Sequence, residues 1–323
     1  MLKTALGGAF AALTMLCTAT PTVAATYPEK PVRIVVPYAP GGASDILARA
    51  LTQELSKGLG QQFIVDNKAG AGGTLGADIV AKAAPDGYTL LLADVAVHTI
   101  APALYPKLPY AKTELAPVIN LATFAHVLIV APNSPLAGFA DVLRKEKAKP
   151  GSVSMASSGN GTSTHLTLEM VNSLTGTKLV HVPYKGGGAA LADVMGAQVD
   201  GMFIGSPPAM PLLQGGKLKA IAVTTSTRMQ ALPAVPTLAE SGLPGFESIA
   251  AQGVFAPAGT PPEVITRLNT EIARIIRLPD VRARWAQLGA EPVNNTPAQF
   301  STWLDSESVK WTKVVKDSGA KPD

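Results

Sequence analysis

Residues 32–55 read VRIVVPYAPGGASDILARALTQEL, and this stretch decides the fold. The apolar, β-branched run at 32–37 predicts a buried strand, and the Gly41-Gly42 pair predicts a tight loop. Ser44-Asp45 then precedes apolar residues at helical spacing, which predicts a capped helix. A strand, a glycine loop and a helix in this order indicate an α/β protein with a mainly parallel sheet.

The same order of elements repeats along the chain. Strands are predicted at 63–65, 88–93, 127–130, 152–156, 179–182, 199–204, 218–223 and 253–256, and helices at 75–83, 139–147, 163–174, 189–195, 262–277, 281–288 and 297–315. The stretch 231–246 is rich in proline and glycine, which predicts a connection rather than an element. The last three helices have no strand partners nearby, so we expect them to fold back on the first domain.

The length of the chain points to two domains. A chain of 323 residues is more than one hydrophobic core usually serves, because single cores tend to split beyond about 250 to 300 residues. We expect a discontinuous first domain of residues 26–125 and 248–323 and a second domain of residues 126–247. The chain would then cross between the two domains twice.

The N-terminus has the order of a secretory signal peptide. Lys3 precedes an apolar run at 5–16, and the segment closes on the small residues Val23-Ala24-Ala25. We therefore expect residues 1–25 to be removed by cleavage after Ala25 and the protein to be exported. The apolar run is shorter than the roughly 20 residues that cross a bilayer, and no later run is suitable, so we do not expect a membrane-embedded protein.

Cysteine and charge exclude several classes of function. The single Cys17 directly follows the apolar run and lies in the segment that we expect to be removed, so the mature chain would have no disulfide, thiolate metal site or cysteine nucleophile. Loss of Lys3, the one charged residue of the segment, lowers the formal net charge from +4 to +3. Arginines cluster only at 274–284, and a solvated helix face explains that cluster better than a nucleic-acid patch, which would be denser.

The sequence contains no familiar catalytic or metal-binding motif. There is no G-x-S-x-G elbow, P-loop or H-E-x-x-H, and the four histidines lack ligand spacing, so we expect no cofactor, no metal and no enzymatic activity. A pairing of His165 with Ser163 or Ser158 would make a serine hydrolase, but a triad also needs an acid and an oxyanion hole. The glycine run 70–76 does not fit G-x-G-x-x-G, which favours a structural loop.

Two loops share a design that suits an anion. Residues 40–44 follow the first strand, and residues 157–163 follow the strand that ends at Ala156. Each combines small residues, which let the backbone approach a ligand, with Ser or Thr at a helix start. Helix starts carry unpaired N–H groups and a partial positive charge, and ligands of open α/β sheets lie beyond the strand ends. We therefore expect an anion there, such as a carboxylate or a phosphate; the alternative is that both loops only cap helices.

Longer motifs extend over nearly the whole mature chain. They are YPEKPVRIVVPYAPGG at 27–42, AGAGG at 69–73, PDGYTL at 85–90, SSGNG at 157–161, HVPYKG at 181–186, GGKL at 215–218, VPTLAESG at 235–242 and FAPAGTP at 255–261. This set closely resembles the Bug-type receptors, the extracytoplasmic solute receptors of tripartite tricarboxylate transporters.

The resemblance implies a periplasmic binding protein of the second structural type, an α/β fold with two Rossmann-like domains, a ligand cleft between them and two chain crossings. Receptors of this family capture dicarboxylates, tricarboxylates, aromatic acids, acidic amino acids or pyridine carboxylates and deliver them to a two-component membrane permease. We therefore expect the protein to act in the periplasm, as a monomer, on a small organic acid or a related solute. A receptor that feeds a signalling sensor instead of a permease is the alternative.

The family's motifs place four segments of this chain against the ligand. The segments contain Tyr38, Gly41, Gly42, Ala43 and Ser44; Asp94 and Val95; Ser157, Ser158, Asn160, Gly161, Thr162 and Ser163; and Ile204, Gly205 and Ser206. No arginine lies in any of these segments, so selectivity would rest on backbone, shape and bound water.

Two of the four segments depart from the family's usual pattern. Residues 94–97 read DVAV where the family has a polar Ser and Thr tract, and residues 204–206 read IGS where many members have an acidic residue. An ionised Asp94 would repel a dicarboxylate by like charge. Asp94 could instead hold the ammonium group of a zwitterion, accept a hydrogen bond from an amide or ring N–H, or cap the next helix without meeting the ligand.

Overall fold

The computed structural model describes residues 27–322, and the predicted signal peptide with its cleavage site lies outside these residues. The strands are β1 (Val32–Val36), β2 (Phe63–Asn67), β3 (Thr89–Asp94), β4 (Leu115–Val130), β5 (Ser154–Ser157), β6 (Val180–Pro183), β7 (Gly201–Gly205), β8 (Lys219–Val223), β9 (Ile249–Pro257) and β10 (Ala290–Pro292). The helices are α1 (Ala43–Leu59), α2 (Thr74–Ala81), α3 (Ala96–Thr99), α4 (Ala101–Leu104), α5 (Phe139–Ala148), α6 (Ser163–Thr175), α7 (Gly187–Met195), α8 (Ser206–Gln214), α9 (Pro262–Ile275), α10 (Pro279–Gln287) and α11 (Pro297–Ser318), with 3-10 turns at Ala71–Gly73 and Lys112–Glu114. Within the described part of the chain, no helix has the length and apolar character needed to cross a membrane.

The strands form one continuous sheet in the order β2-β1-β3-β9-β4-β7-β5-β6, with β8 and β10 also paired to β4. β1 runs parallel to β2 and β3, and β5 runs parallel to β6 and β7. At the centre, β9 is antiparallel to β3 and β4, and β4 is also antiparallel to β7 and β8. The prediction of a mainly parallel sheet is therefore wrong at the centre, because the chain leaves the first strands along β4 and returns to them along β9.

β4 is the element that differs most from its prediction. We predicted a strand only at 127–130, whereas β4 has 16 residues. Its first part contains Pro117 and Asn120, which interrupt the strand pattern, and the register of β4 on β9 shifts next to both of them. Such irregularities let a strand continue past residues that fit it poorly. The partner of β4 changes along its length, since its pairing with β9 ends at Ala125 and its pairing with β7 begins at His126.

Several short elements were not predicted. α8 begins at Ser206 although Pro207 and Pro208 follow, because prolines in the first turn cost no intrahelical hydrogen bond. α3 and α4 have 4 residues each, too few to show a helical period. β10 pairs with β4 at residues 122–124, so the expectation that the C-terminal tail brings no strand is wrong.

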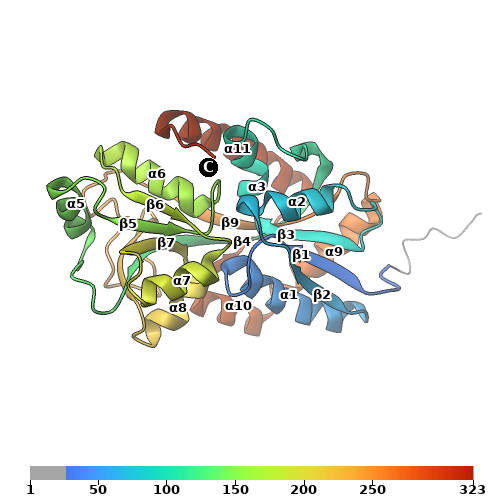
Figure 1. Ribbon diagram of the computed structural model, residues 1–323. Helices are drawn as coiled ribbons and strands as arrows, with labels where there is room; N and C mark the ends of the chain where they lie inside the picture. The colour runs from blue at the N-terminus through green and yellow to red at the C-terminus, as the bar shows by residue number, and fades with distance from the viewer. Residues whose placement is uncertain (1–26, 323) are drawn as a thin grey trace, which may run out of the picture.

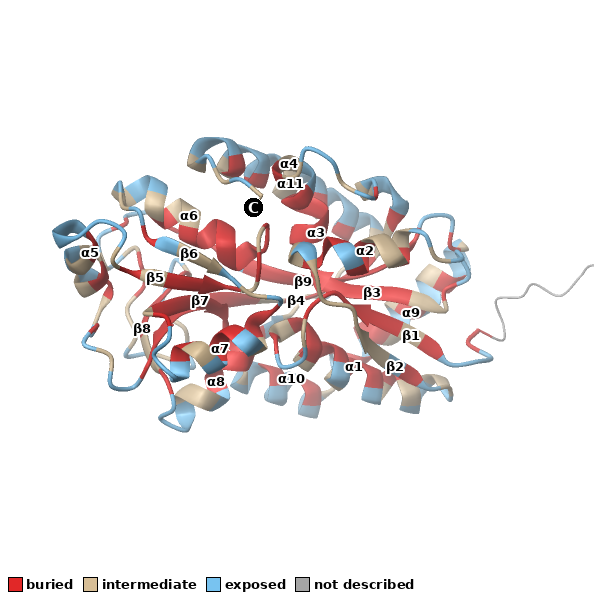
Figure 2. Cartoon of the chain, viewed as in Figure 1, coloured by how far each residue is buried: buried red, intermediate tan, exposed pale blue. Residues whose placement is uncertain are grey.

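Helices cover both faces of the sheet (Figure 1). α2, α3, α6 and α11 lie on one face, and α1, α7, α8 and α10 lie on the other. The central strands are therefore buried on both sides (Figure 2), as is usual for a sheet between two helix layers. Ile34 and Leu91 of the sheet share one apolar cluster with Leu268, Trp285 and Leu304 of α9, α10 and α11. The C-terminal helices thus pack on the strands at the start of the chain.

β4 divides the molecule into two halves. The first half contains β1, β2, β3, β9 and β10 with α1 to α4 and α9 to α11, and the second contains β5 to β8 with α5 to α8. The apolar side chains of the second half form clusters of their own. We propose that the halves correspond to the predicted domains, residues 26–125 with 248–323 and residues 126–247.

Candidate functional site

The two loops that we expect to bind an anion come from opposite halves. Residues 37–42 lead from β1 into α1, and residues 158–162 lead from β5 into α6. The starts of both helices line one small cavity of about 40 Å³, the inner cavity. One water molecule needs about 10–15 Å³ of such space, so the inner cavity has the size of a single small polar group such as a carboxylate.

Most of the predicted site residues line the inner cavity. They are Tyr38, Gly42, Ala43, Ser44, Asp94, Ser158, Thr162, Ser163, Ile204 and Gly205. The cavity is completed by Phe124, His126, Thr164, Gly187 and Gln252, which sequence reasoning missed. Phe124, His126 and Gln252 lie within β4 and β9, and nothing in a buried strand's sequence marks one residue as facing a ligand. Among the described residues, no lysine or arginine lines the inner cavity, so the two helix starts are what its lining offers to a negative charge.

The remaining predicted site residues do not line the inner cavity. They are Gly41, Val95, Ser157, Asn160, Gly161 and Ser206. Some of them shape the loops instead: the Gly41 N–H donates to Asp45 Oδ2 at 3.0 Å, and the Ser206 hydroxyl donates to the Gly289 carbonyl at 3.0 Å. Contact of these residues with a ligand stays a prediction.

A second hollow of about 250 Å³, the outer cavity, adjoins the inner one, and Tyr38 and Ser158 line both. The glycine run that we interpreted as a structural loop lies here, at residues 70–73. A Cβ atom on Gly72 would come within 1.8 Å of the Asn160 carbonyl oxygen, so this run permits a close approach between the halves. Lys185 is the basic side chain that lines the outer cavity, and it is exposed.

The halves touch each other around both cavities. The Ala39 N–H in the first half donates to the Lys185 carbonyl in the second at 3.0 Å. Glycines make this contact possible, because a Cβ atom on Gly188 of α7 would lie 2.3 Å from the Pro40 carbonyl oxygen. The structure therefore has the halves closed over the inner cavity, and a ligand of more than one small group would enter only when they part.

Asp94 joins the two halves beside the inner cavity. Its Oδ1 accepts the N–H of Ala96 at 2.9 Å, so Asp94 caps α3, as one of the interpretations required. Its Oδ2 is hydrogen-bonded to the hydroxyl of Ser163 at the start of α6. Asp94 is only 8% exposed, and burial raises the pKa of its carboxyl above the ordinary value. Whether a ligand meets Asp94 stays a prediction.

His126 is a neighbour of Ser163 that sequence reasoning missed. Its Nε2 lies 3.1 Å from Ser163 Oγ, and its Nδ1 lies 3.2 Å from Thr167 Oγ1. His126 is fully buried, and burial lowers its pKa to about 3, so the ring is uncharged at neutral pH. The Ser163 hydroxyl lies between Asp94 and His126, and the suggested pairing of Ser163 with His165 is therefore wrong.

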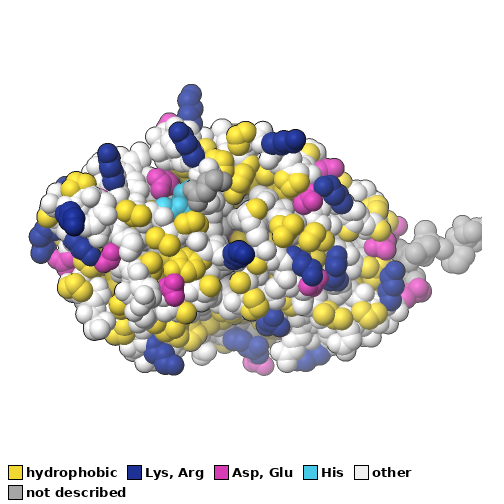
Figure 3. All heavy atoms as spheres, viewed as in Figure 1, with side chains coloured by type: hydrophobic (Ala, Val, Ile, Leu, Met, Phe, Trp, Pro, Cys, Tyr) yellow, Lys and Arg dark blue, Asp and Glu magenta, His cyan; other side chains and the backbone are white. Residues whose placement is uncertain are grey.

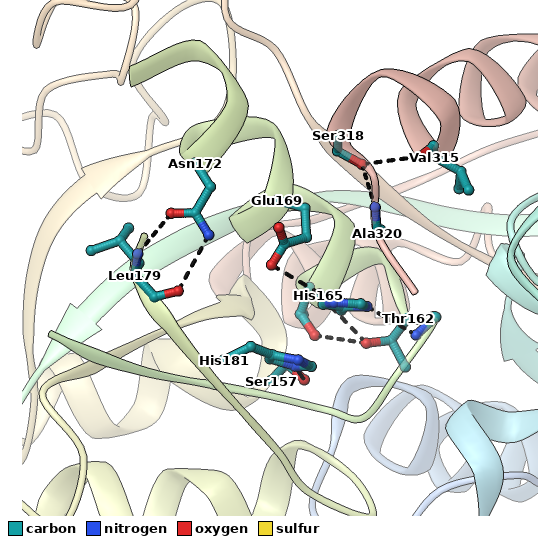
Figure 4. A network of polar contacts seen from close by, with 12 residues as sticks. Ser157, Thr162, His165, Glu169, Asn172, Leu179, His181, Val315, Ser318 and Ala320 are labelled. Carbon is teal, nitrogen blue, oxygen red and sulfur yellow. Dashed lines mark hydrogen bonds and ion pairs between the residues drawn. The ribbon is translucent and has the colours of Figure 1, made fainter. Parts of the chain in front are cut away.

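His165 and His181 support the loop before α6 (Figure 4). Their rings stack with centroids 4.0 Å apart. His165 Nδ1 accepts the N–H of Gly161 at 3.1 Å, and His181 Nε2 lies 2.6 Å from Ser157 Oγ. The two histidines thus hold opposite ends of this loop, which is a structural role.

A larger hollow of about 600 Å³ lies between residues 225–231, α10 and β10. No predicted site residue lines it, and the guanidinium of Arg228 there is already bonded to Glu240. Lys and Arg side chains are spread over the face shown in Figure 3 instead of forming a dense patch. The inner cavity is the better candidate, because two helix starts and most predicted residues meet there.

Residues 47–320 match the family described as the tripartite tricarboxylate transporter family receptor. The chain belongs to this receptor family. Protein BugT of Bordetella pertussis is 38% identical to this receptor over 305 residues, which cover 94% of this chain and 94% of that protein.

Two solved structures similar to this receptor carry ligands. An R. palustris protein with adipate is 34% identical, with a TM-score of 0.89 over 92% of this chain and 100% of that one. MatC from Rhodopseudomonas palustris with bound malate is 36% identical, with a TM-score of 0.85 over 90% of this chain and 100% of that one. The receptor thus has the periplasmic binding protein fold that its motifs implied. Because the family consists of solute receptors and not enzymes, the serine hydrolase hypothesis is set aside.

Proposed function

We propose that this receptor captures a small carboxylate-bearing solute in the periplasm and delivers it to the membrane permease of a tripartite transporter. The observation that carries the proposal is the convergence of two helix starts, one from each half, on the inner cavity. Helix starts favour anions, because their first N–H groups have no partner within the helix. A ligand held by both halves would stabilise the closed arrangement over an open one.

The energetics favour a site that both halves build. A charge-assisted hydrogen bond contributes about 1.5 to 3 kcal/mol net, whereas micromolar binding requires about 8 kcal/mol. A few donors from one loop would fall short of this after the costs of ordering the ligand. Donors from the starts of both α1 and α6 would reach it.

The two cavities favour a short dicarboxylate as the ligand. The inner cavity of about 40 Å³ suits one carboxylate, and the outer cavity of about 250 Å³ suits the rest of the molecule. Lys185 in the outer cavity would attract the second carboxylate. The relatives solved with adipate and with malate support this class.

Thermal-shift assays and calorimetry on the mature protein test this proposal. The panel consists of malate, adipate, their monoamides and diamides, and amino acids. A ligand at a hundred times its Kd adds about 2.7 kcal/mol to the free energy of unfolding, which a melting curve resolves. The dicarboxylates should raise the melting temperature and the diamides should not. Equal shifts from acids and diamides would refute a carboxylate site, and no shift at all would refute this function.

The partner and the location need tests of their own. We propose that the signal peptide is cleaved after Ala25 and that the mature receptor is a monomer, which the mass of the exported protein and light scattering will check. Deletion of the permease subunits should abolish solute uptake while the receptor still binds. Unchanged uptake would instead favour a receptor that feeds a signalling sensor.

A further inference from the structure

Asp94 is the carboxylate of the candidate site, and little around it balances a negative charge. Among the described residues, no lysine or arginine lines the inner cavity or the small space next to Asp94 that α11 closes. Glu307 of α11 also lines that space, but it already accepts a hydrogen bond from Trp311 and pairs with Lys310. Burying a carboxylate without a cation beside it is costly, so burial raises the pKa of Asp94 although hydrogen bonds from Ser163 and Ala96 lower it.

The other titratable groups around Asp94 bring no positive charge. The Tyr38 hydroxyl, from the loop after β1, is uncharged, because burial raises its pKa well above the ordinary value. His126 of β4 is uncharged because burial lowers its pKa to about 3. His98 of α3 stacks on Phe255, and burial lowers its pKa to about 4, so its ring is uncharged at neutral pH. His165 of α6 accepts the Gly161 N–H, and its Nε2 lies 3.9 Å from Glu169. The facing residue of β9, Gln252, is neutral.

A chain of hydroxyl and imidazole groups leads away from Asp94. Ser163 Oγ is bonded to Asp94 and lies 3.1 Å from Nε2 of His126. On the other side of the ring, Nδ1 lies 3.2 Å from Thr167 Oγ1, which is 2.8 Å from the Ser163 carbonyl oxygen. Each hydroxyl donates one proton, and a neutral ring donates from one nitrogen only, so the direction of one bond sets the direction of the next.

This series of hydrogen bonds can form whether Asp94 is ionised or protonated. With Asp94 ionised, Ser163 donates to it, the Nε2–H of His126 donates to Ser163, and the Thr167 hydroxyl donates to Nδ1. With Asp94 protonated, every one of these bonds reverses, and the Thr167 hydroxyl donates to the Ser163 carbonyl. No heavy atom has to move. The three bonds between Asp94, Ser163, His126 and Thr167 are kept in both states, whereas the bond from Thr167 to the Ser163 carbonyl is made only when Asp94 is protonated.

We propose that Asp94 takes up one proton when the halves close on a carboxylate, so that capture of the ligand is coupled to proton uptake. The inference rests on the proposed function. In an open receptor, water reaches Asp94 and favours its ionised form. Closure excludes that water and adds the negative charge of the ligand, and both changes favour the protonated form. Closure also brings the Ser163 hydroxyl to Asp94, which lowers the pKa, but burial is the larger cause and the pKa is raised. A site with a carboxylate of its own can thus accept an anion.

The proposal fixes the direction of the pH dependence. The closed, ligand-bound form holds one proton more than the open form, so binding tightens as the pH falls. Affinity should change by up to about tenfold per pH unit between the pKa of Asp94 in the open form and its pKa in the bound form. Below both values, Asp94 is protonated throughout and the dependence ends.

Isothermal titration calorimetry in two buffers with different ionisation enthalpies counts the protons. The probes are malate and adipate, at a pH where both of their carboxylates are ionised. The unaltered receptor should take up close to one proton per ligand. Asp94→Asn, whose amide can still donate to Ser163, should take up none, and its affinity should no longer fall as the pH rises. Asp141→Asn, in the first turn of α5, is the matched control and should keep the proton uptake.

The possible results separate this proposal from the proposed function. Binding without proton uptake, with an affinity that does not depend on pH, would overturn the role of Asp94 and leave the receptor function intact. No binding of either dicarboxylate would overturn both. If Asp94→Asn does not fold, infrared difference spectra of the unaltered receptor decide: a protonated carboxyl band that appears on addition of malate supports the proposal, and its absence refutes it.

Discussion

The loops at 37–42 and 158–162 occupy the same place in their halves, yet they are built differently. In the first, Asp45 accepts the Gly41 N–H at 3.0 Å, and Arg49 pairs with the same carboxylate. Its helix, α1, has no side-chain cap. The second loop ends in the capping residue Thr162 and is held by hydroxyl and imidazole groups.

The difference assigns separate tasks to the two loops. The first loop balances its charge internally, and its glycines bring it against α7, so it should control closure. The second loop leads into the chain that joins Asp94, Ser163 and His126, so it should control the response to protons. Substitutions in or next to each loop test this division.

Gly188→Ala should have the largest effect, because it blocks the approach of the first loop to α7. The new Cβ atom would lie 2.3 Å from the Pro40 carbonyl oxygen in the closed arrangement. An overpacked contact costs about 1 to 3 kcal/mol, so dicarboxylate affinity should fall roughly tenfold to a hundredfold in calorimetry. The melting temperature without ligand should not fall, since alanine is the better helix former.

Gly138→Ala is the control for this experiment, because nothing lies within 4 Å of a Cβ atom at that position. Its affinity should match that of the unaltered receptor. An unchanged affinity in Gly188→Ala would show that ligand binding does not need the closed arrangement.

Ser163→Ala should destabilise the receptor more than Ser44→Ala does. Loss of the Ser163 hydroxyl leaves two buried partners, Asp94 and His126, without it, at a cost of about 2 kcal/mol in the free energy of unfolding. Loss of the Ser44 hydroxyl removes one bond, to Gln252, at a cost of about 1 kcal/mol. Urea denaturation without ligand measures both. Equal losses would mean that the two helix starts are built alike.

As the pH falls, the network of the second loop, which includes His126, should lose stability at a higher pH than the first loop does. Burial lowers the pKa of His126 from 6.5 to about 3, so the folded protein resists a proton that the unfolded chain accepts. This contribution to stability is complete above about pH 6.5 and declines as the pH falls, by about 1.4 kcal/mol at about pH 5.5. His126→Gln should flatten that part of the curve of unfolding free energy against pH.

The first loop supplies the contrast to His126. Burial alone would raise the pKa of Asp45, but hydrogen bonds from Arg49, Gly41 and Asn67 outweigh it and lower the pKa. The stability from Asp45 is therefore present above its unfolded pKa and is lost only below about pH 4. Asp45→Asn should leave the slope between about pH 5.5 and about pH 6.5 unchanged. A change of slope there would contradict the division between the loops.

Lys185→Gln should have the smallest effect. Lys185 is exposed at the outer cavity, where the loops of both halves meet, and its charge would steer anions toward the cleft. The association rate for malate should fall a few-fold at low ionic strength and recover in high salt, because salt screens exposed charges. Lys178→Gln, in the turn before β6, is the matched control. A loss that persists in high salt would mean that Lys185 binds the ligand directly.

Sequence reasoning predicted the loop residues that line the inner cavity and missed the strand residues that line it. Gly42, Ser44 and Ser158 stand in glycine and serine loops at helix starts, a local pattern with a chemical meaning. His126 and Gln252 lie within β4 and β9 and look like any other residue of a buried strand. The sequence also offered several roles for Asp94, and it could not place Ser163 opposite that carboxylate.

The sequence by itself determined the order of most strands and helices, the family, and the two loops whose helix starts line the inner cavity. It could do so because periodicity, caps and glycine turns are local properties of the chain. Only the tertiary structure decided that β4 runs unbroken through both halves and that the halves touch each other around the inner cavity. The tertiary structure alone also brings Asp94 and Ser163 together. The two residues are 69 positions apart, and their contact exists only when the halves pack together. Such contacts depend on the packing of whole elements, which no short stretch of sequence encodes.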